Sequence, residues 1–289
     1  MYSPKEYWQR ITERYNSVDS SGLAPVLHPN APEWFNEIID KLQFRAVLRA
    51  LARAQVPIGA RFLDVGCGTG RWIRRYEDLG FTPFGVDATF GMLRIAREHQ
   101  TVAPLTAGQA NSLPFASEVF DCVSDVTVVQ HIPYELQTGA LAELVRVLRP
   151  GGRILLLELV RGDDSHVFPR PPNDWISEVE SCGARLVESF GVEYLFLDRL
   201  FVKCVQAASK RTNDFVVSVQ SDTAKSDKKD NPLARVVYWG LRRMTVCLSA
   251  LAEPIFAKIC PASMATHAIF VFIKTSEYLP LPILPGDLC

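Results

Sequence analysis

Short apolar runs alternate with segments of helical length from Arg61 to about Leu197. The runs that predict strands are Phe62–Val65, Thr82–Val86, Val119–Val126, Arg153–Leu159 and Ala184–Val192. Helices are predicted between them at about 70–79, 90–98, 134–148 and 173–182. Strands that alternate with helices are typical of a mostly parallel sheet covered on both faces, so the pattern predicts an α/β fold.

The segments on either side of this alternation have different patterns. Before it, apolar residues between Phe35 and Ala50 recur every three or four positions, which predicts a helix. After it, 206–231 is polar and predicts a loop, 233–259 predicts a helix, and Thr266–Ile273 predicts a last strand. We therefore divide the chain into an N-terminal segment (1–58), an α/β core (59–197), a loop and helical insertion (198–265), and a final strand with an irregular tail (266–289).

Composition and charge narrow the class of protein. The chain has 289 residues, of which 48% are hydrophobic and 22% charged, which is typical of a globular protein. The formal net charge is −1 and there is no long basic run, so we expect no nucleic-acid partner. The seven cysteines are scattered, which favours reduced thiols and no metal site. With neither a signal sequence nor an apolar run of membrane-spanning length, we expect a cytoplasmic protein.

The glycine-rich segment after the first predicted strand is the most informative part of the sequence. Residues 64–70 read Asp-Val-Gly-Cys-Gly-Thr-Gly between a strand and a helix. Glycines allow a sharp turn and a close approach of a ligand to the backbone, and the helix beyond presents free N–H groups. The dinucleotide pattern G-x-G-x-x-G fails at Arg71, and no phosphate-binding P-loop pattern is present. The turn therefore predicts a nucleotide-type cofactor other than a dinucleotide.

Five motifs, taken in order along the chain, resemble those of class I S-adenosylmethionine-dependent methyltransferases. They are Leu63–Gly70, Gly85–Asp87, Gly108–Phe115, Phe120–Val123 and Leu148–Gly152. The resemblance covers residues 60–160 approximately. Within this class, the chain is similar to the small-molecule methyltransferases of type 11. Gln109 stands where the family has an acid beside the adenine, and its amide oxygen can still accept a hydrogen bond from an amino group.

The resemblance implies a fold, a cofactor and a set of binding residues. The implied fold is a Rossmann-like sheet of seven strands, the last one antiparallel, with an N-terminal helical lid and a helical insertion before the last strand. The implied cofactor is S-adenosyl-L-methionine, and the implied partner is a small or medium-sized organic acceptor. The residues implied to bind the cofactor are Asp64, Gly66, Gly68, Gly70, Asp87, Ala88, Gln109, Ala110, Asp125 and Val126.

His131 is the candidate for a catalytic side chain. It follows the fourth predicted core strand, at the edge of the sheet where α/β proteins bind ligands. An alcohol or enol acceptor needs a general base, most often histidine; the alternative role for His131 is to order its loop. Glu158 is expected to be a solvated carboxylate at a strand end, and His28 and His166 to be surface residues. Tyr7 and Trp8 fit either a lid or packing on the first helix.

Several alternatives stay open at this point. Oxygen of a metabolite or sugar is the favoured methyl acceptor, with nitrogen and carbon still open. A non-catalytic module that binds S-adenosylmethionine and an enzyme that uses it for non-methyl chemistry are the rival functions.

The helix predicted at 233–259 has an apolar stripe of six residues: Val237, Leu241, Met244, Leu248, Leu251 and Ile255. Packing of this stripe on the sheet is the default expectation. A cap over the acceptor pocket and a membrane-surface helix that suits a lipid-linked acceptor are the alternatives. As a hypothesis we choose the cap.

Overall fold

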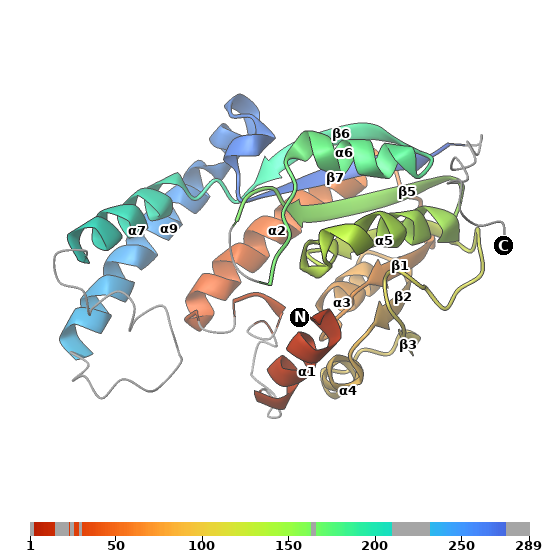
Figure 1. Ribbon diagram of the computed structural model, residues 1–289, viewed down its shortest axis with the longest axis horizontal. Coiled ribbons are helices and arrows are strands. Elements are labelled where there is room, and N and C mark those ends of the chain that lie inside the picture. The colour runs from red at the N-terminus through yellow and green to blue at the C-terminus, as the bar shows by residue number, and fades with distance from the viewer. Residues whose placement is uncertain are drawn as a thin grey trace.

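A computed structural model describes residues 3–14, 23, 26–28, 31–162, 166–209 and 232–275 of the chain. Its centre is one seven-stranded sheet in the order β3-β2-β1-β4-β5-β7-β6 (Figure 1). The strands are β1 (Arg61–Val65), β2 (Thr82–Asp87), β3 (Leu105–Ala107), β4 (Phe120–Val126), β5 (Leu148–Leu159), β6 (Ala184–Val192) and β7 (His267–Lys274). All neighbouring pairs are parallel except those of β7, which runs antiparallel to both β5 and β6. The expected Rossmann-like sheet with an antiparallel last strand is confirmed.

Helices cover both faces of the sheet. The described helices are α1 (Pro4–Arg14), α2 (Glu33–Ala54), α3 (Arg71–Asp78), α4 (Phe90–Glu98), α5 (Tyr134–Val147), α6 (Pro172–Ser181), α7 (Phe196–Ser209) and α9 (Pro232–Ile259), with 3₁₀ turns η2 (Val129–His131) and η3 (Ala262–Met264). One core layer joins the sheet to α5 and α6, around Leu141, Leu144 and Trp175. The other joins it to α2 and α3, around Val47 and Tyr76. Burial on both faces explains why the strands read as continuous apolar runs.

Two elements were missed by the sequence pattern. The strand β3 has only three residues, too few for a recognisable run. The helix α7 begins at Phe196 and extends to Ser209, whereas a polar loop was expected from residue 206. That expectation is wrong for 206–209, and the rest of the expected loop lies outside the described residues.

The helices α7 and α9 pack on each other and project from the body of the molecule (Figure 1). The apolar stripe of α9 does not face the sheet. All six of its residues are exposed, and their exposed fractions lie between 46% for Leu241 and 77% for Leu251. The default expectation that this stripe packs in the core is therefore wrong. The side of α9 that packs carries Tyr238, Val246 and Ser249, and Val246 contacts the cluster of α2 residues that includes Phe35 and Ile39.

Candidate functional site

A cavity of about 330 Å³ lies at the carboxyl ends of β1, β2 and β4. Its walls come from the glycine turn after β1, the loops after β2, β3 and β4, and the N-terminal helix α1. Eight of the residues predicted from the sequence line it: Gly66, Gly68, Asp87, Ala88, Gln109, Ala110, Val126 and His131. Three others, Asp64, Gly70 and Asp125, lie behind this wall and do not line it.

Two glycines of the turn after β1 lie too close to neighbouring loops for a side chain to fit. Gly66 has φ +66°, and a Cβ there would lie 2.3 Å from Cγ2 of Val128. Gly70 has φ +73°, and a Cβ there would lie 2.2 Å from Oγ1 of Thr101. Only glycine combines this backbone conformation with this contact distance, so the turn keeps its backbone open to the cavity.

Asp87, the last residue of β2, ties two loops of the cavity together. Its Oδ2 accepts the backbone N–H of Gly68 at 2.9 Å and its Oδ1 accepts that of Thr89 at 2.8 Å. Burial raises the pKa of Asp87, and these two hydrogen bonds oppose the rise. Each carboxylate oxygen keeps further acceptor capacity, so Asp87 can also receive two hydroxyl groups.

Two carboxyl groups behind the wall have an unused oxygen. Oδ2 of Asp64 and Oδ2 of Asp125 are buried without a hydrogen-bond partner among the described residues, and so is Nε1 of Trp72, which lines the cavity. Burial raises the pKa of Asp64 to about 7, against the hydrogen bond that Ser124 donates to its Oδ1. Buried polar groups are normally paired, so the indole N–H of Trp72, which borders the cavity, fits a polar ligand there.

Arg71 connects the glycine turn to α2. Its guanidinium is buried and donates to Oδ1 of Asp40 at 2.7 Å and to Oε1 of Gln43 at 3.2 Å. Burial by itself would raise the pKa of Asp40. The hydrogen bonds and charges of Arg75 and Arg71 outweigh this effect and lower the pKa. The residue that excluded the dinucleotide pattern therefore has a structural role, because it fixes the first turn of α3 against α2.

His131 lies in the 3₁₀ turn η2 that follows β4, and other aromatic rings surround it. Its Nδ1 lies 3.1 Å from the carbonyl oxygen of His166, which can only accept, so Nδ1 carries the proton. The indole of Trp8 meets the imidazole edge-on at 5.0 Å between centroids, and the ring of His166 stacks on it at 5.5 Å. Burial lowers the pKa of His131 to about 4, against the hydrogen bond with His166. The imidazole is therefore neutral at neutral pH, with its lone pair on Nε2.

The carboxyl of Glu158, at the end of β5, holds the turn that carries His131. Its oxygens accept the backbone N–H groups of Val128, Val129 and Gln130 at 3.1, 2.9 and 3.0 Å. Burial raises the pKa of Glu158 well above its usual range, and the neighbouring Asp125 raises it further. The expectation of a solvated carboxylate is wrong, because Glu158 is fully buried. An acid within the apolar run Leu155–Leu159 was the available signal of burial.

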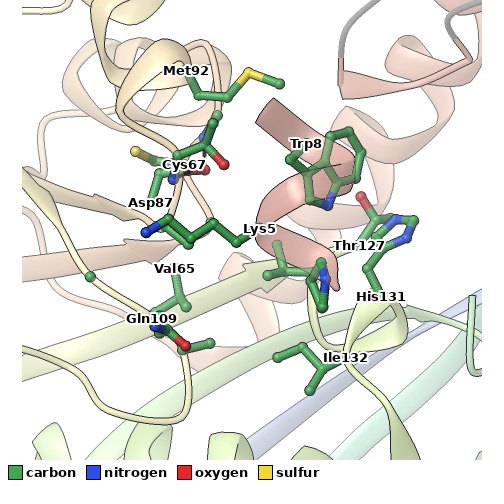
Figure 2. Close-up of a pocket in the computed structure, with 18 of the residues that line it drawn as sticks. Lys5, Trp8, Val65, Cys67, Asp87, Met92, Gln109, Thr127, His131 and Ile132 are labelled. Carbon is green, nitrogen blue, oxygen red and sulfur yellow. Dashed lines mark hydrogen bonds between the residues drawn. The ribbon is translucent and has the colours of Figure 1, made fainter. Parts of the chain in front are cut away.

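The N-terminal helix α1 closes one side of the cavity. Trp8 and Lys5 line it, and the ring of Tyr7 stacks on that of His166 at 4.7 Å. Figure 2 shows Trp8, Thr127 and His131 on one side of the cavity and Cys67 and Asp87 on the other, with Lys5 extending between them. The rings of Tyr7 and Trp8 contact His166 and His131, and α1 packs against α4. His166 was expected at the surface, and its stacking between Tyr7 and His131 corrects this.

Thr127, a residue that the sequence did not single out, is strained at the cavity wall. It has φ +61°, in the left-handed region that a β-branched residue rarely adopts. Its N–H donates to the carbonyl of Leu157 at 2.8 Å, which holds it there. Backbone strain of this kind is concentrated at ligand-binding sites.

The sequence of the core matches a known domain family. Residues 63–156 match the methyltransferase domain. The chain is 34% identical over 125 residues to a demethylmenaquinone methyltransferase of Renibacterium salmoninarum, a match that covers 43% of this chain and 52% of that protein. It is 37% identical over 123 residues to a malonyl-acyl-carrier-protein O-methyltransferase of Erwinia pyrifoliae, covering 42% of this chain and 46% of that protein. The chain thus spans about half the length of these curated relatives.

A solved structure extends the likeness to the whole fold. Phosphoethanolamine N-methyltransferase 2 of Haemonchus contortus, solved with S-adenosyl-L-methionine, aligns with a TM-score of 0.53 at 17% identity. The alignment covers 95% of this chain and 60% of that one, and at this identity it supports the fold alone. The match of residues 63–156 therefore identifies a methyltransferase domain within the α/β core of this chain.

Proposed function

We propose that this protein transfers a methyl group from S-adenosylmethionine to a small organic acceptor. The observation that carries the proposal is that the glycine turn, Asp87 and His131 line one cavity, with Asp87 and His131 on opposite sides of it. This arrangement places a cofactor site opposite a histidine whose Nε2 lone pair receives only a long contact from Gln130. When bound, S-adenosylmethionine supplies a methyl group that is already activated for transfer. The protein then has mainly to position the acceptor and to exclude water from the cavity.

The residues of the wall divide into binding roles by their chemistry. We assign the ribose hydroxyls to Asp87, with Ala88 beside it, and the adenine to Gln109 and Ala110. The backbone of the glycine turn at Gly66 and Gly68 borders the same space. Asp64 and Asp125, each with one unpaired buried oxygen, suit the charged amino-acid end of the cofactor through small shifts at the end of their strands, and Gly70 and Val126 support the same region.

His131 is proposed to accept the proton that the acceptor loses. Its Nδ1–H is held by the carbonyl of His166, and Gln130 approaches Nε2 only through a long contact of 3.4 Å. A hydroxyl group of the acceptor can displace that contact. Because the pKa of His131 is about 4, the imidazole is a weak base, which favours an acceptor that is itself acidic. We therefore propose a phenol or an enol as the methylated group, or a carboxylate that is already ionised at neutral pH and needs no base, rather than a sugar hydroxyl.

The wall near His131 supports an acceptor with an apolar body. Trp8, Ile132 and Leu136 are its neighbours in the cavity. The relatives include a demethylmenaquinone methyltransferase and a malonyl-acyl-carrier-protein O-methyltransferase, and the second of these supports an oxygen acceptor. An O-methylated aromatic or carboxylic metabolite is the product that we propose.

The test is an acceptor screen with S-adenosylmethionine labelled in its methyl group. Panels of phenols and enols, carboxylic acids, sugars and amines should give label transfer in the first two only, with S-adenosylhomocysteine formed in equal amount. His131→Ala should lower turnover roughly 10²–10⁴-fold with cofactor affinity retained. Binding of the cofactor without transfer in any panel would support a non-catalytic module, and cofactor-dependent conversion without label transfer would support non-methyl chemistry.

A further inference from the structure

The exposed side of α9 is a continuous apolar strip. Seven residues form it: Val237, Leu241, Met244, Leu248, Leu251, Ile255 and Ile259. At 100° per residue they fall within an arc of about 80°, and from first to last they span about 33 Å along the helix. The helix α7, which packs against α9, adds exposed Leu197 and Leu200. A contiguous apolar surface of this size indicates an interaction site rather than scattered exposed side chains.

The two helices α7 and α9 carry an excess of basic residues. The helices α7 and α9 contain six basic residues and only two acidic ones, although the whole chain has a net charge of −1. Both acids are used internally. Asp198 accepts from the guanidinium of Arg242 at 3.0 Å, and Glu253 accepts the backbone N–H groups of Glu193 and Tyr194 at 2.7 and 2.8 Å. On the described surface of these helices the exposed charged residues, Lys203, Arg243 and Lys258, are all basic.

The position of this pair of helices relates it to the cavity. The chain leaves the sheet at the end of β6 and returns at the start of β7. Because β6 is parallel to β5 and β7 is antiparallel, both points lie at the carboxyl edge of the sheet, where the cavity is. Figure 1 shows α7 and α9 extending beyond that edge, on the side of the molecule where α1 lies.

We propose that the exposed face of α9, with its basic flanks, docks this protein on an anionic membrane surface. An apolar strip with cations and without exposed acids is the pattern of a helix that lies in the plane of the interface, attracted to anionic headgroups. A second copy of the chain fits this face less well, because the described part of the face offers no exposed acid to pair with the cations of the other copy. None of the described helices is long and apolar enough to cross a membrane, so the contact is with the surface.

The experiment is flotation of the full chain with lipid vesicles. Vesicles of phosphatidylcholine with one third phosphatidylglycerol should retain the protein, and vesicles of phosphatidylcholine alone should retain at least tenfold less. Retention should fall as NaCl is raised from 0.1 to 1 M, because the screening length decreases from about 10 Å to about 3 Å. Binding that is equal on both vesicles at all salt concentrations would contradict the role of the basic flanks.

Matched variants locate the contact. The double change Leu248→Glu and Leu251→Glu should lower retention at least tenfold without changing the melting temperature, because both side chains are exposed. The control pair, Ile58→Glu and Val102→Glu, alters exposed apolar residues at 85% and 81% away from α9 and should bind like the unchanged protein. The pair Lys203→Glu and Lys258→Glu should remove the salt-sensitive part of binding.

Two results would overturn the proposal. One is retention by anionic vesicles that survives the change of Leu248 and Leu251, since another surface would then be responsible. The other is no retention at all, together with a dimer in sedimentation that the same double change abolishes, since the face would then belong to a second copy. The vesicle measurement does not depend on methyl transfer, so it is independent of the proposed function.

Discussion

Oε1 of Glu158 accepts the backbone N–H of Val129 at 2.9 Å, so a buried carboxyl of β5 holds the turn that follows β4. This hydrogen bond belongs to a group of three that fixes the backbone on which His131 lies. Glu158 is not one of the described residues that line the cavity. It therefore acts on the site by fixing the position of this turn.

Glu158→Ala should lower the free energy of unfolding by about 2–4 kcal/mol, because Gln130 loses its acceptor and Val128 and Val129 keep only longer bonds to Oδ1 of Asp125, at 3.3 and 3.4 Å. Turnover should fall as well, since η2 is released. Urea unfolding and single-turnover kinetics measure the two effects. Glu188→Ala is the matched control: Glu188 pairs with Arg49 and Arg53 near the surface, and its loss should cost less than about 1 kcal/mol. Equal losses for the two variants would contradict the role of Glu158.

Asp87→Ala should weaken binding of S-adenosylmethionine by about 1–3 kcal/mol, because the two hydroxyls of the ribose lose a charged acceptor. Titration calorimetry of the purified variant measures the change. The affinity of Asp87→Asn should lie between those of the unchanged protein and of Asp87→Ala, since its amide oxygen keeps one acceptor for Gly68 or Thr89. Unchanged affinity in a folded Asp87→Ala variant would remove this residue from the cofactor site.

Stability should depend on pH through His131. Its pKa is about 4 in the folded protein and 6.5 in the unfolded chain, so between these values only the unfolded chain takes up the proton. The folded protein therefore loses stability as pH falls from 6.5 to 4, by at most about 3 kcal/mol from this group. His131→Gln, which cannot titrate, should show a smaller decrease in urea unfolding between pH 7 and 4.5. Parallel pH profiles for the two proteins would mean that His131 does not resist protonation.

Gly66→Ala should abolish cofactor binding and destabilise the protein, because the new methyl group meets Val128 at 2.3 Å and the backbone is left-handed there. Gly139→Ala is the control. Gly139 lies within α5, and no atom lies within 4 Å of an added Cβ, so this change should leave binding intact and stabilise the helix slightly. Calorimetry and thermal melting of the two variants give the comparison. Binding retained by Gly66→Ala would show that the turn can widen without loss.

The core was predictable from the sequence because its signals are local. The glycine turn, the acid at the end of β2 and the alternating apolar runs each lie within a few residues of one another, and they predicted the strands of the core apart from β3. The family resemblance supplied the seven-stranded sheet and its antiparallel last strand, whereas the position of β7 between β5 and β6 came from the structure. The cofactor residues predicted from motifs stay predictions until binding is measured.

The surroundings of His131 and the side of α9 that packs were not predictable in the same way. His131 and His166 are separated by the helix α5 and the strand β5, and no local pattern indicates that their rings stack. A periodic stripe on α9 shows that the helix has an apolar side, but not that the opposite side, with Val246, is the one that the fold covers. Burial of Glu158 likewise depends on three N–H groups of another strand's turn.

The insertion between β6 and β7 starts and ends at neighbouring positions, since Val192 and His267 are register partners in the sheet. The two strands close on each other whatever lies between them, so the length of α7 and α9 is not constrained by strand register. Closing a longer loop costs little additional entropy. This pair of helices can therefore change in length or sequence, and with it the surface that the protein offers to partners, without any change in the sheet that forms the cavity.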